Sequence, residues 1–189
     1  MKNLAKFIVA AILFALTLSA SALEVKGVKV NETAQVGGST LVLNGAGVRT
    51  KMVFKVYVAG LYLTQKTNDA SAVISDTGNK RVSMHMLREL SAEKLLHALD
   101  EGFEANNSAA EMTAIDSQMK SFKQIMTSAK AVKEGDVILL DYSGQNTTVN
   151  LNGKALGTGE GAAFNQALLR VWLGAKPVDA SLKKAMLGQ

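Results

Sequence analysis

Alternation of apolar and polar residues dominates the first part of the chain, and this two-residue period is typical of strands. Residues 25–43 predict two strands, broken at Asn31-Glu32 and Gly37-Gly38. Residues 51–63 predict one long strand with a bend at Gly60, and residues 81–87 alternate again. On the long strand, the pattern assigns one face to Met52, Phe54, Val56 and Val58.

The middle of the chain changes to a helical period. Ser91 is a plausible N-cap with Glu93 in the first turn, and an apolar stripe extends from Leu95 to Phe103. A second helix is predicted over residues 109–130, because five apolar residues recur there at spacings of three and four. They are Met112, Ile115, Met119, Phe122 and Met126. This stripe is either ordinary core or, because methionine is flexible, the wall of a pocket for an apolar ligand.

The last third returns to strands and ends in helices. Residues 137–142 and 147–151 predict a hairpin, and Asn152-Gly153 is a strong turn signal before a short strand at 154–156. A glycine-rich segment leads into a helix that ends at Gly174, and a last helix is expected over residues 180–187. This order predicts an α+β fold with a largely antiparallel sheet and helices grouped on one side.

Residues 1–22 have the three parts of a secretory signal peptide. Lys2 and Lys6 give a basic start, an apolar run begins at Phe7 and ends near Leu18, and Ala20-Ser21-Ala22 closes the segment. The run is shorter than the roughly 20 residues of a membrane-spanning helix. We therefore expect cleavage after Ala22, export to a periplasm, no stable membrane anchor, and one domain over residues 23–189.

Charge and cysteine content narrow the classes of function. The formal net charge is +5, and it falls by two to +3 when Lys2 and Lys6 are removed, because no acidic residue leaves with them. Basic residues are scattered and aromatic residues are few, so we expect no nucleic-acid partner. The chain has no cysteine, which excludes disulfides, thiol chemistry and thiolate metal sites.

Other motifs do not complete a catalytic or cofactor pattern. The glycines at residues 157–161 lack the spacing of a dinucleotide-binding loop, and no phosphate-binding lysine motif accompanies them. His85 and His97 are the only histidines, and no further ligands stand near them in a zinc pattern. No serine occupies a nucleophile elbow. We therefore expect no cofactor and no metal.

Arg49 is the residue whose surroundings need an explanation. It stands after Gly45-Ala46-Gly47, which we interpret as a turn, and before the apolar strand. Burying a charge is costly unless another group pairs with it. The guanidinium is therefore expected to face either a protein carboxylate or an anionic ligand.

Several segments resemble the chalcone isomerase family. Residues 43–63, LNGAGVRTKMVFKVYVAGLYL, are similar to the segment in which a glycine-flanked arginine precedes a strand of the type K-x-x-x-x-G-x-Y-L. Residues 91–99 resemble that family's first long helix, 132–154 its central hairpin and 159–174 its ligand-flanking helix, in the same order. The similarity covers most of residues 25–187, and the W-L-G-x-x-P ending resembles the exported bacterial branch called chalcone isomerase-like.

The resemblance implies an open-faced β-sandwich, in which a large antiparallel sheet carries a layer of helices on one face, with a cleft between them. In the plant enzymes the cleft holds a flavonoid, and the arginine steers a phenolate oxygen into a ring closure. In the plastid relatives the cleft holds a fatty acid, whose carboxylate pairs with the arginine. Arg49 is the position that carries over to this chain.

The other polar positions of the enzymatic site carry different residues here. The family's strand threonine corresponds to Tyr57, its tyrosine at the helix start to the region of Ser91, and its asparagine one turn later to that of Ala98. Its hydroxyl residue on the late helix corresponds to the region of Asn165. We interpret these residues, with Arg49, as the ligand-facing set.

The residues leave three functional hypotheses open. The first is an exported binding protein that holds a small, mostly apolar anion such as a fatty acid, because a guanidinium alone can bind a carboxylate. The second is an isomerase, an intramolecular lyase acting on an unknown substrate with Arg49 as its catalytic residue. The third is a structural role, in which Arg49 pairs with a protein carboxylate such as Asp141 or Glu160 and the fold serves as an interaction scaffold.

Overall fold

The structure, a computed structural model, describes residues 22–189. The expected signal peptide lies outside these residues except for Ala22, which belongs to the first strand, so export and cleavage stay predictions. In the described part of the chain, no helix is long and apolar enough to cross a membrane.

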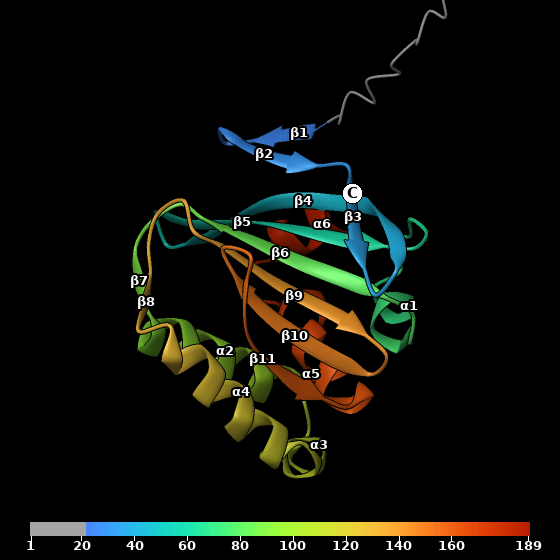
Figure 1. Cartoon of the computed structure of the whole chain (residues 1–189), viewed down its shortest axis with the longest axis vertical. Coiled ribbons are helices and arrows are strands. Elements are labelled where there is room, and N and C mark those ends of the chain that lie inside the picture. The colour runs from blue at the N-terminus through green and yellow to red at the C-terminus, as the bar shows by residue number, and fades with distance from the viewer. Residues whose placement is uncertain (1–21) are drawn as a thin grey trace, which may run out of the picture.

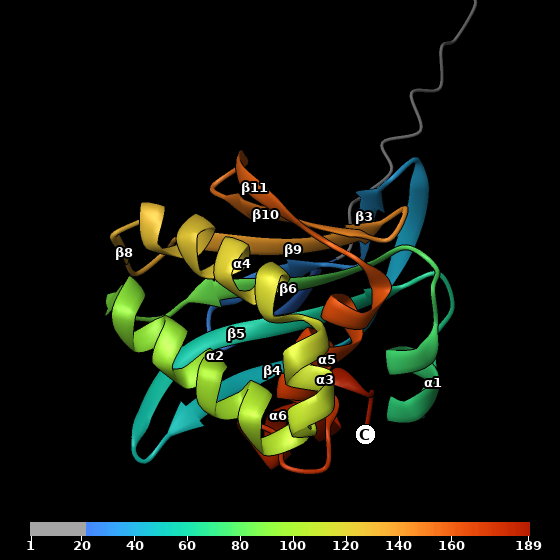
Figure 2. The same ribbon diagram turned by 90° about the horizontal axis from the view of Figure 1, so that it is seen from below.

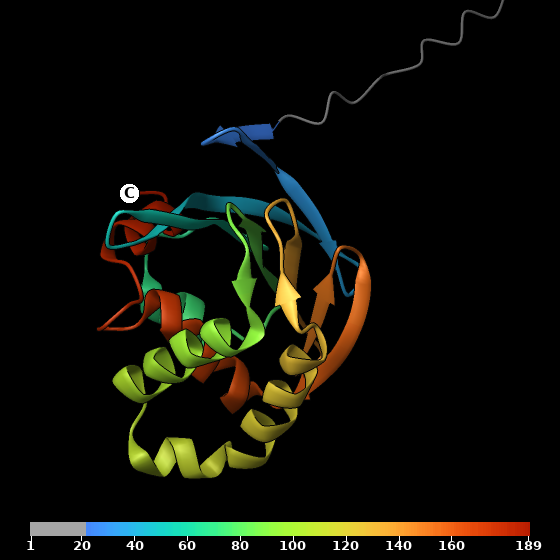
Figure 3. The same cartoon turned by 90° about the vertical axis from the view of Figure 1, so that its left-hand side faces the viewer.

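A seven-stranded antiparallel sheet forms the centre of the fold (Figure 1). Its strands follow the order β11-β10-β9-β6-β5-β4-β3, so most neighbours in the sheet are also neighbours in sequence. The strands are β3 (Thr33–Val36), β4 (Ser39–Lys51), β5 (Phe54–Leu63), β6 (Lys80–Met86), β9 (Val137–Ser143), β10 (Asn146–Leu151) and β11 (Lys154–Glu160). The sheet curls around the helices, which Figure 3 shows from one end.

A short hairpin and a separate short pair of strands lie outside the seven-stranded sheet. β1 (Ala22–Val25) and β2 (Val28–Asn31) form a hairpin that covers the sheet on the face away from α2 and α4 (Figure 1). Val30 is buried there among side chains of the sheet that include Leu41, Val58 and Tyr62. β7 (Leu90–Ser91) pairs with β8 (Ala131–Val132) beside the helices.

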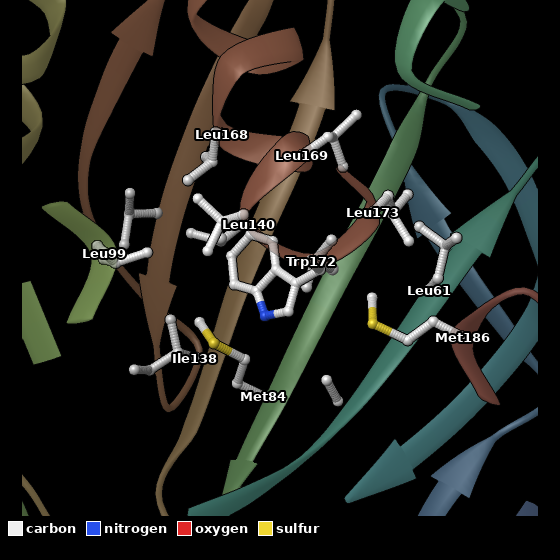
Figure 4. Close-up of a cluster of buried hydrophobic side chains, with 14 of the residues drawn as sticks. Leu61, Met84, Leu99, Ile138, Leu140, Leu168, Leu169, Trp172, Leu173 and Met186 are labelled. Atoms are coloured by element: carbon white, nitrogen blue, oxygen red, sulfur yellow. The ribbon is translucent and has the colours of Figure 1, made fainter. Parts of the chain in front are cut away.

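Helices gather on the other face of the sheet (Figure 2). They are α1 (Ala70–Ser75), α2 (Ala92–Asn106), α3 (Ala109–Ala114), α4 (Asp116–Ser128), α5 (Ala162–Leu173) and α6 (Ala180–Met186). The core lies between these helices and the sheet. Figure 4 shows Trp172 of α5 in this core, with Met84 and Leu140 from the sheet and Leu99 from α2 around it. The expected α+β open-faced sandwich is confirmed.

The helical predictions hold, with one break. Ser91 caps α2, because its side chain accepts a hydrogen bond from the Lys94 backbone at 3.3 Å. The single helix expected over residues 109–130 is two helices, α3 and α4, that meet at Ile115. Asp116 then stands in the first turn of α4, where a carboxylate meets the positive end of the helix. The apolar stripe is buried as expected, with Met112 only half-buried at its start.

The long strand expected over residues 51–63 was wrong at its start. Lys51 pairs with Phe54 across a turn at Met52 and Val53, so the chain reverses there and β5 begins at Phe54. Met52 has φ +57°, in the left-handed region that tight hairpin turns use. The proposed single face therefore does not exist. Val56 packs in the helix-covered core, whereas Val58 packs on the opposite side of the sheet.

Gly45-Ala46-Gly47 is not a turn but part of β4, which is a second correction. A Cβ atom on Gly45 would lie 2.1 Å from the carbonyl oxygen of Ala185, and one on Gly47 would lie 2.6 Å from Ala185 Cβ. Because glycine has no side chain, α6 packs directly on the backbone of β4. Arg49 follows on the same face of this strand, two positions after Gly47.

Several features were not anticipated from the sequence, among them the short β7–β8 pair. Residues 25–43 contain a further reversal at Lys26-Gly27, which separates β1 from β2. The polar segment before Asp76 contains α1, whose N-cap Asp69 accepts hydrogen bonds from the first turn. β11 extends to Glu160 instead of ending at residue 156.

Candidate functional site

Arg49 on β4 stands directly opposite Tyr57 on β5 in the sheet. The guanidinium carbon lies 5.5 Å from the centre of the Tyr57 ring, and Arg49 is only 6% exposed. The Tyr57 hydroxyl accepts a hydrogen bond of 2.9 Å from the indole Nε1 of Trp172 on α5. These three residues link two strands to a helix and form what we call the Arg49 cluster.

The electrostatics of the cluster keep Tyr57 neutral. Burial raises the pKa of the Tyr57 hydroxyl, while the charge of Arg49 and the hydrogen bond from Trp172 act in the opposite direction. Asp179 adds a smaller upward contribution to the same pKa. Tyr57 therefore keeps its proton at neutral pH, and the positive charge of the cluster belongs to Arg49.

Arg49 has no carboxylate partner among the described residues. Its Nε atom is buried without a hydrogen-bond partner, and the guanidinium forms no ion pair with an Asp or Glu of residues 22–189. The expected alternatives are occupied or remote. Asp141 accepts a 2.7 Å hydrogen bond from Arg81, and Glu160 is exposed on β11. The pairing of Arg49 with Asp141 or Glu160 is therefore wrong.

Asp179, the N-cap residue of α6, also binds groups other than Arg49. One of its carboxylate oxygens accepts from the backbone of Thr50 at 2.9 Å, and the other caps α6 through Ser181 and Leu182. These bonds hold the carboxylate at Thr50 and at the start of α6, and it forms no ion pair with Arg49.

The space between the sheet and the helices is almost completely filled. A cavity beside Arg49 is lined by Tyr57 and Trp172 and by apolar side chains that include Met84 and Met126. Its free volume is about 10 Å³, close to the smallest space that a single water occupies, roughly 10–15 Å³. The methionine stripe thus packs as core, and the interior in this conformation has no room for an apolar tail.

Two open grooves reach Arg49 from outside. The first groove, of about 460 Å³, lies between the β4–β5 hairpin and the start of α2, and the second, of about 230 Å³, follows the later turns of α2. Arg49, Lys51 and Ala98 line both. The first groove is completed by Val56, Leu90, Glu93, Lys94 and His97, and the second by Glu101, Gly102, Ala105, Lys176 and Val178.

The five site residues expected from the sequence separate into two groups. The structure brings Arg49, Tyr57 and Ala98 together around the cavity and the grooves. Ser91 and Asn165 line none of these spaces. The Ser91 hydroxyl caps α2, and the buried Asn165 side chain donates to the hydroxyl of Thr147 at 3.3 Å.

The sequence did not identify Trp172 and Lys51 as members of the site. Trp172 belongs to the apolar stripe of α5, and no local pattern shows that its indole nitrogen reaches Tyr57. Lys51 was predicted to lie inside one continuous strand. The chain in fact turns at Met52 and Val53, and this turn places Lys51 at both grooves.

The grooves contain no metal centre in the described residues. No group of three or more His, Cys, Asp or Glu side chains that could hold a metal occurs within residues 22–189. His97 lies 3.5 Å from Glu101 on the exposed side of α2, and burial lowers the pKa of His85 on β6.

Comparisons with known proteins agree with this fold. A family model described as chalcone isomerase-like matches residues 22–188. No curated protein matches the chain in sequence. Among solved structures, the crystal structure of a fatty-acid binding protein from Arabidopsis thaliana is similar with a TM-score of 0.63 and 15% sequence identity, over 85% of this chain and 92% of that one. At this identity the likeness concerns the fold.

Proposed function

The chain belongs to the chalcone isomerase-like family, and from this premise we propose that it is an exported, non-catalytic binding protein for a small, mostly apolar carboxylate, held through Arg49. A fatty acid is the ligand that represents this class. Two facts support the choice: the solved protein of similar fold is named as a fatty-acid binding protein, and this chain keeps a buried arginine beside open grooves.

The observation that carries the proposal is the buried Nε atom of Arg49, which has no hydrogen-bond acceptor in the described residues. Arg49 is only 6% exposed, and its guanidinium lies over the Tyr57 ring. No carboxylate of residues 22–189 forms an ion pair with it. A buried charge without a counter-charge is unfavourable, and an incoming carboxylate would supply both the counter-charge and an acceptor for Nε. The planar fork of a guanidinium suits the two oxygens of a carboxylate.

The first groove is the place where such a ligand fits. Its volume lies within the range of about 300–1,000 Å³ that is common for small-molecule pockets. The carboxylate would meet Arg49 and Lys51, and the tail would follow the apolar side chains of Val56, Leu90 and Ala98. Longer tails would need the filled interior to open, and the flexible side chains of Met84 and Met126 border that interior.

The same geometry argues against ring-closing catalysis. That reaction needs several donors oriented on the ketone and on the nucleophile. Here Ala98 has no polar side-chain atom, Ser91 caps a helix, and Asn165 faces Thr147. The Tyr57 hydroxyl already accepts from Trp172, which leaves its own proton as a single donor next to Arg49.

The test is the affinity of Arg49 variants for saturated fatty acids of increasing length, measured by isothermal titration calorimetry. Arg49→Ala removes a charge-assisted hydrogen bond worth about 1.5–3 kcal/mol, so affinity should fall about ten- to a hundredfold. Arg49→Lys should recover only part of it, because an ammonium group lacks the bidentate fork.

Arg170→Ala is the matched control, because Arg170 on α5 pairs with Glu111 and lines neither groove. Its ligand affinity should equal that of the unchanged protein. If Arg49→Ala instead lost about 3–5 kcal/mol of unfolding free energy with its fatty-acid affinity unchanged, Arg49 would have a structural role and the proposal would fail. Rapid loss of chalcone absorbance in the presence of the protein would favour the isomerase.

A further inference from the structure

The described residues expose few large apolar side chains, and most of these are neighbours in sequence. Four such residues are exposed: Leu23, Met52, Val53 and Phe54. Met52 is 89% exposed, Val53 83% and Phe54 54%. Isolated exposed apolar residues are ordinary, but a contiguous group at one projecting site marks an interaction surface.

These three residues form the tip of the β4–β5 hairpin. Lys51 and Phe54 are the last paired residues of the ladder, so Met52 and Val53 make the turn itself. The tip lies at one end of the sheet, which is the end that faces the viewer in Figure 3. A positive φ at Met52 would suit glycine or asparagine better, so the methionine is not there to favour the turn.

Basic side chains surround the apolar tip. Lys51 and Lys55 flank it in sequence and both are exposed. Arg88 follows β6 in sequence, and its guanidinium carbon lies 4.7 Å from the centre of the Phe54 ring. The acidic neighbours are Glu89, which follows Arg88, Glu93, which lines the first groove with Lys51, and Glu101. Glu101 lies 3.9 Å from Lys51 with both side chains about 60% exposed, which makes a weak, solvated pair.

We propose that this hairpin tip, residues 51–55 together with Arg88, docks the protein on the surface of an anionic lipid bilayer. Apolar side chains that enter the headgroup boundary, with lysine and arginine around them, are the combination that binds such surfaces. A protein partner fits less well, because a stable protein interface buries about 1,200–2,000 Å², and this tip presents only three apolar side chains.

Docking by the tip would bring the grooves to the bilayer. Lys51 belongs to the tip and also lines both grooves, and Arg49 lies two residues before it on the same strand. An apolar molecule could then pass between the bilayer and a groove with little exposure to water. The docking itself does not depend on a ligand at Arg49, so the two proposals can fail separately.

Cosedimentation with vesicles tests the docking. The protein is prepared from residue 22 onward, so that the apolar run near the start of the chain does not itself bind lipid. It should bind vesicles of phosphatidylcholine mixed with phosphatidylglycerol, and bind much less to phosphatidylcholine alone. Met52→Asn with Phe54→Ser should reduce vesicle affinity at least tenfold, and Lys51→Ala or Lys55→Ala roughly fivefold each.

Leu23→Ser and Lys120→Ala are the matched controls, because they remove an exposed apolar side chain of β1 and an exposed lysine of α4 away from the tip. Both should bind anionic vesicles as the unchanged protein does, and so should Arg49→Lys. No binding to anionic vesicles would overturn the proposal, and so would equal binding to both vesicle types. Unchanged binding by the Met52 and Phe54 double variant would also overturn it.

Discussion

At the scale of single residues, the Tyr57 hydroxyl joins the sheet to the helix layer. It accepts from Trp172, and both residues are almost completely buried, at 2% and 1% exposure. Water therefore cannot replace either partner without a change in packing. Both residues line the cavity beside Arg49, so the Trp172–Tyr57 hydrogen bond holds one wall of the candidate site in place.

Tyr57→Phe should destabilise the fold, because the indole Nε1 of Trp172 would lose its acceptor while staying buried. The expected loss of unfolding free energy is about 1–3 kcal/mol, measured by urea denaturation. Tyr62→Phe is the control, since the Tyr62 hydroxyl donates to the carbonyl of Asn31, an exposed residue that water can reach. A Tyr57→Phe protein as stable as the Tyr62→Phe protein would show that Trp172 finds another acceptor.

At the scale of elements, the packing of α6 on β4 sets the surroundings of Arg49. Gly45 and Gly47 leave room for α6, and Asp179 at the start of that helix binds the backbone next to Arg49 through Thr50. A displacement of α6 would therefore reach the site through the strand. Glycine is required here for close approach, since neither position has a positive φ.

Gly47→Ala should destabilise the protein, because its new Cβ would lie 2.6 Å from the Cβ of Ala185. Overpacking of this kind costs about 1–3 kcal/mol, measurable by thermal or urea unfolding. Adding Ala185→Gly removes the clashing atom and should recover part of the loss, although glycine within a helix itself costs about 0.5–1 kcal/mol. A double variant no more stable than Gly47→Ala would contradict this account.

At the scale of the whole molecule, the sequence of residues 1–22 carries the prediction of export. The full chain, expressed in a bacterial host with a periplasm, should be recovered there with Leu23 as its first residue, as N-terminal sequencing would show. Ala22→Phe should block cleavage, because the site requires a small residue. A chain that still begins at Met1 in the membrane fraction would contradict export as a cleaved protein.

The sequence by itself determined the features that depend on local patterns. The two-residue and helical periods predicted the antiparallel sheet and its helices, and the Asn152-Gly153 turn lies where the pattern placed it. The cap of α2 at Ser91 could be predicted, because capping involves only residues three positions apart. The order of these elements predicted an α+β class with a largely antiparallel sheet, since connections between neighbouring strands are short, and the open-faced sandwich was expected from the family resemblance.

Only the tertiary structure decided the features that depend on residues distant in sequence. The segment before Arg49 is a strand because it pairs with β5, and its glycines let α6, more than 130 residues later, pack on it. Asp141 is unavailable to Arg49 because Arg81 reaches it across β6 and β9. Asn165 faces Thr147, and Trp172 faces Tyr57. Burial, partners and free volume arise from packing between elements, and local patterns do not encode which side chains meet there.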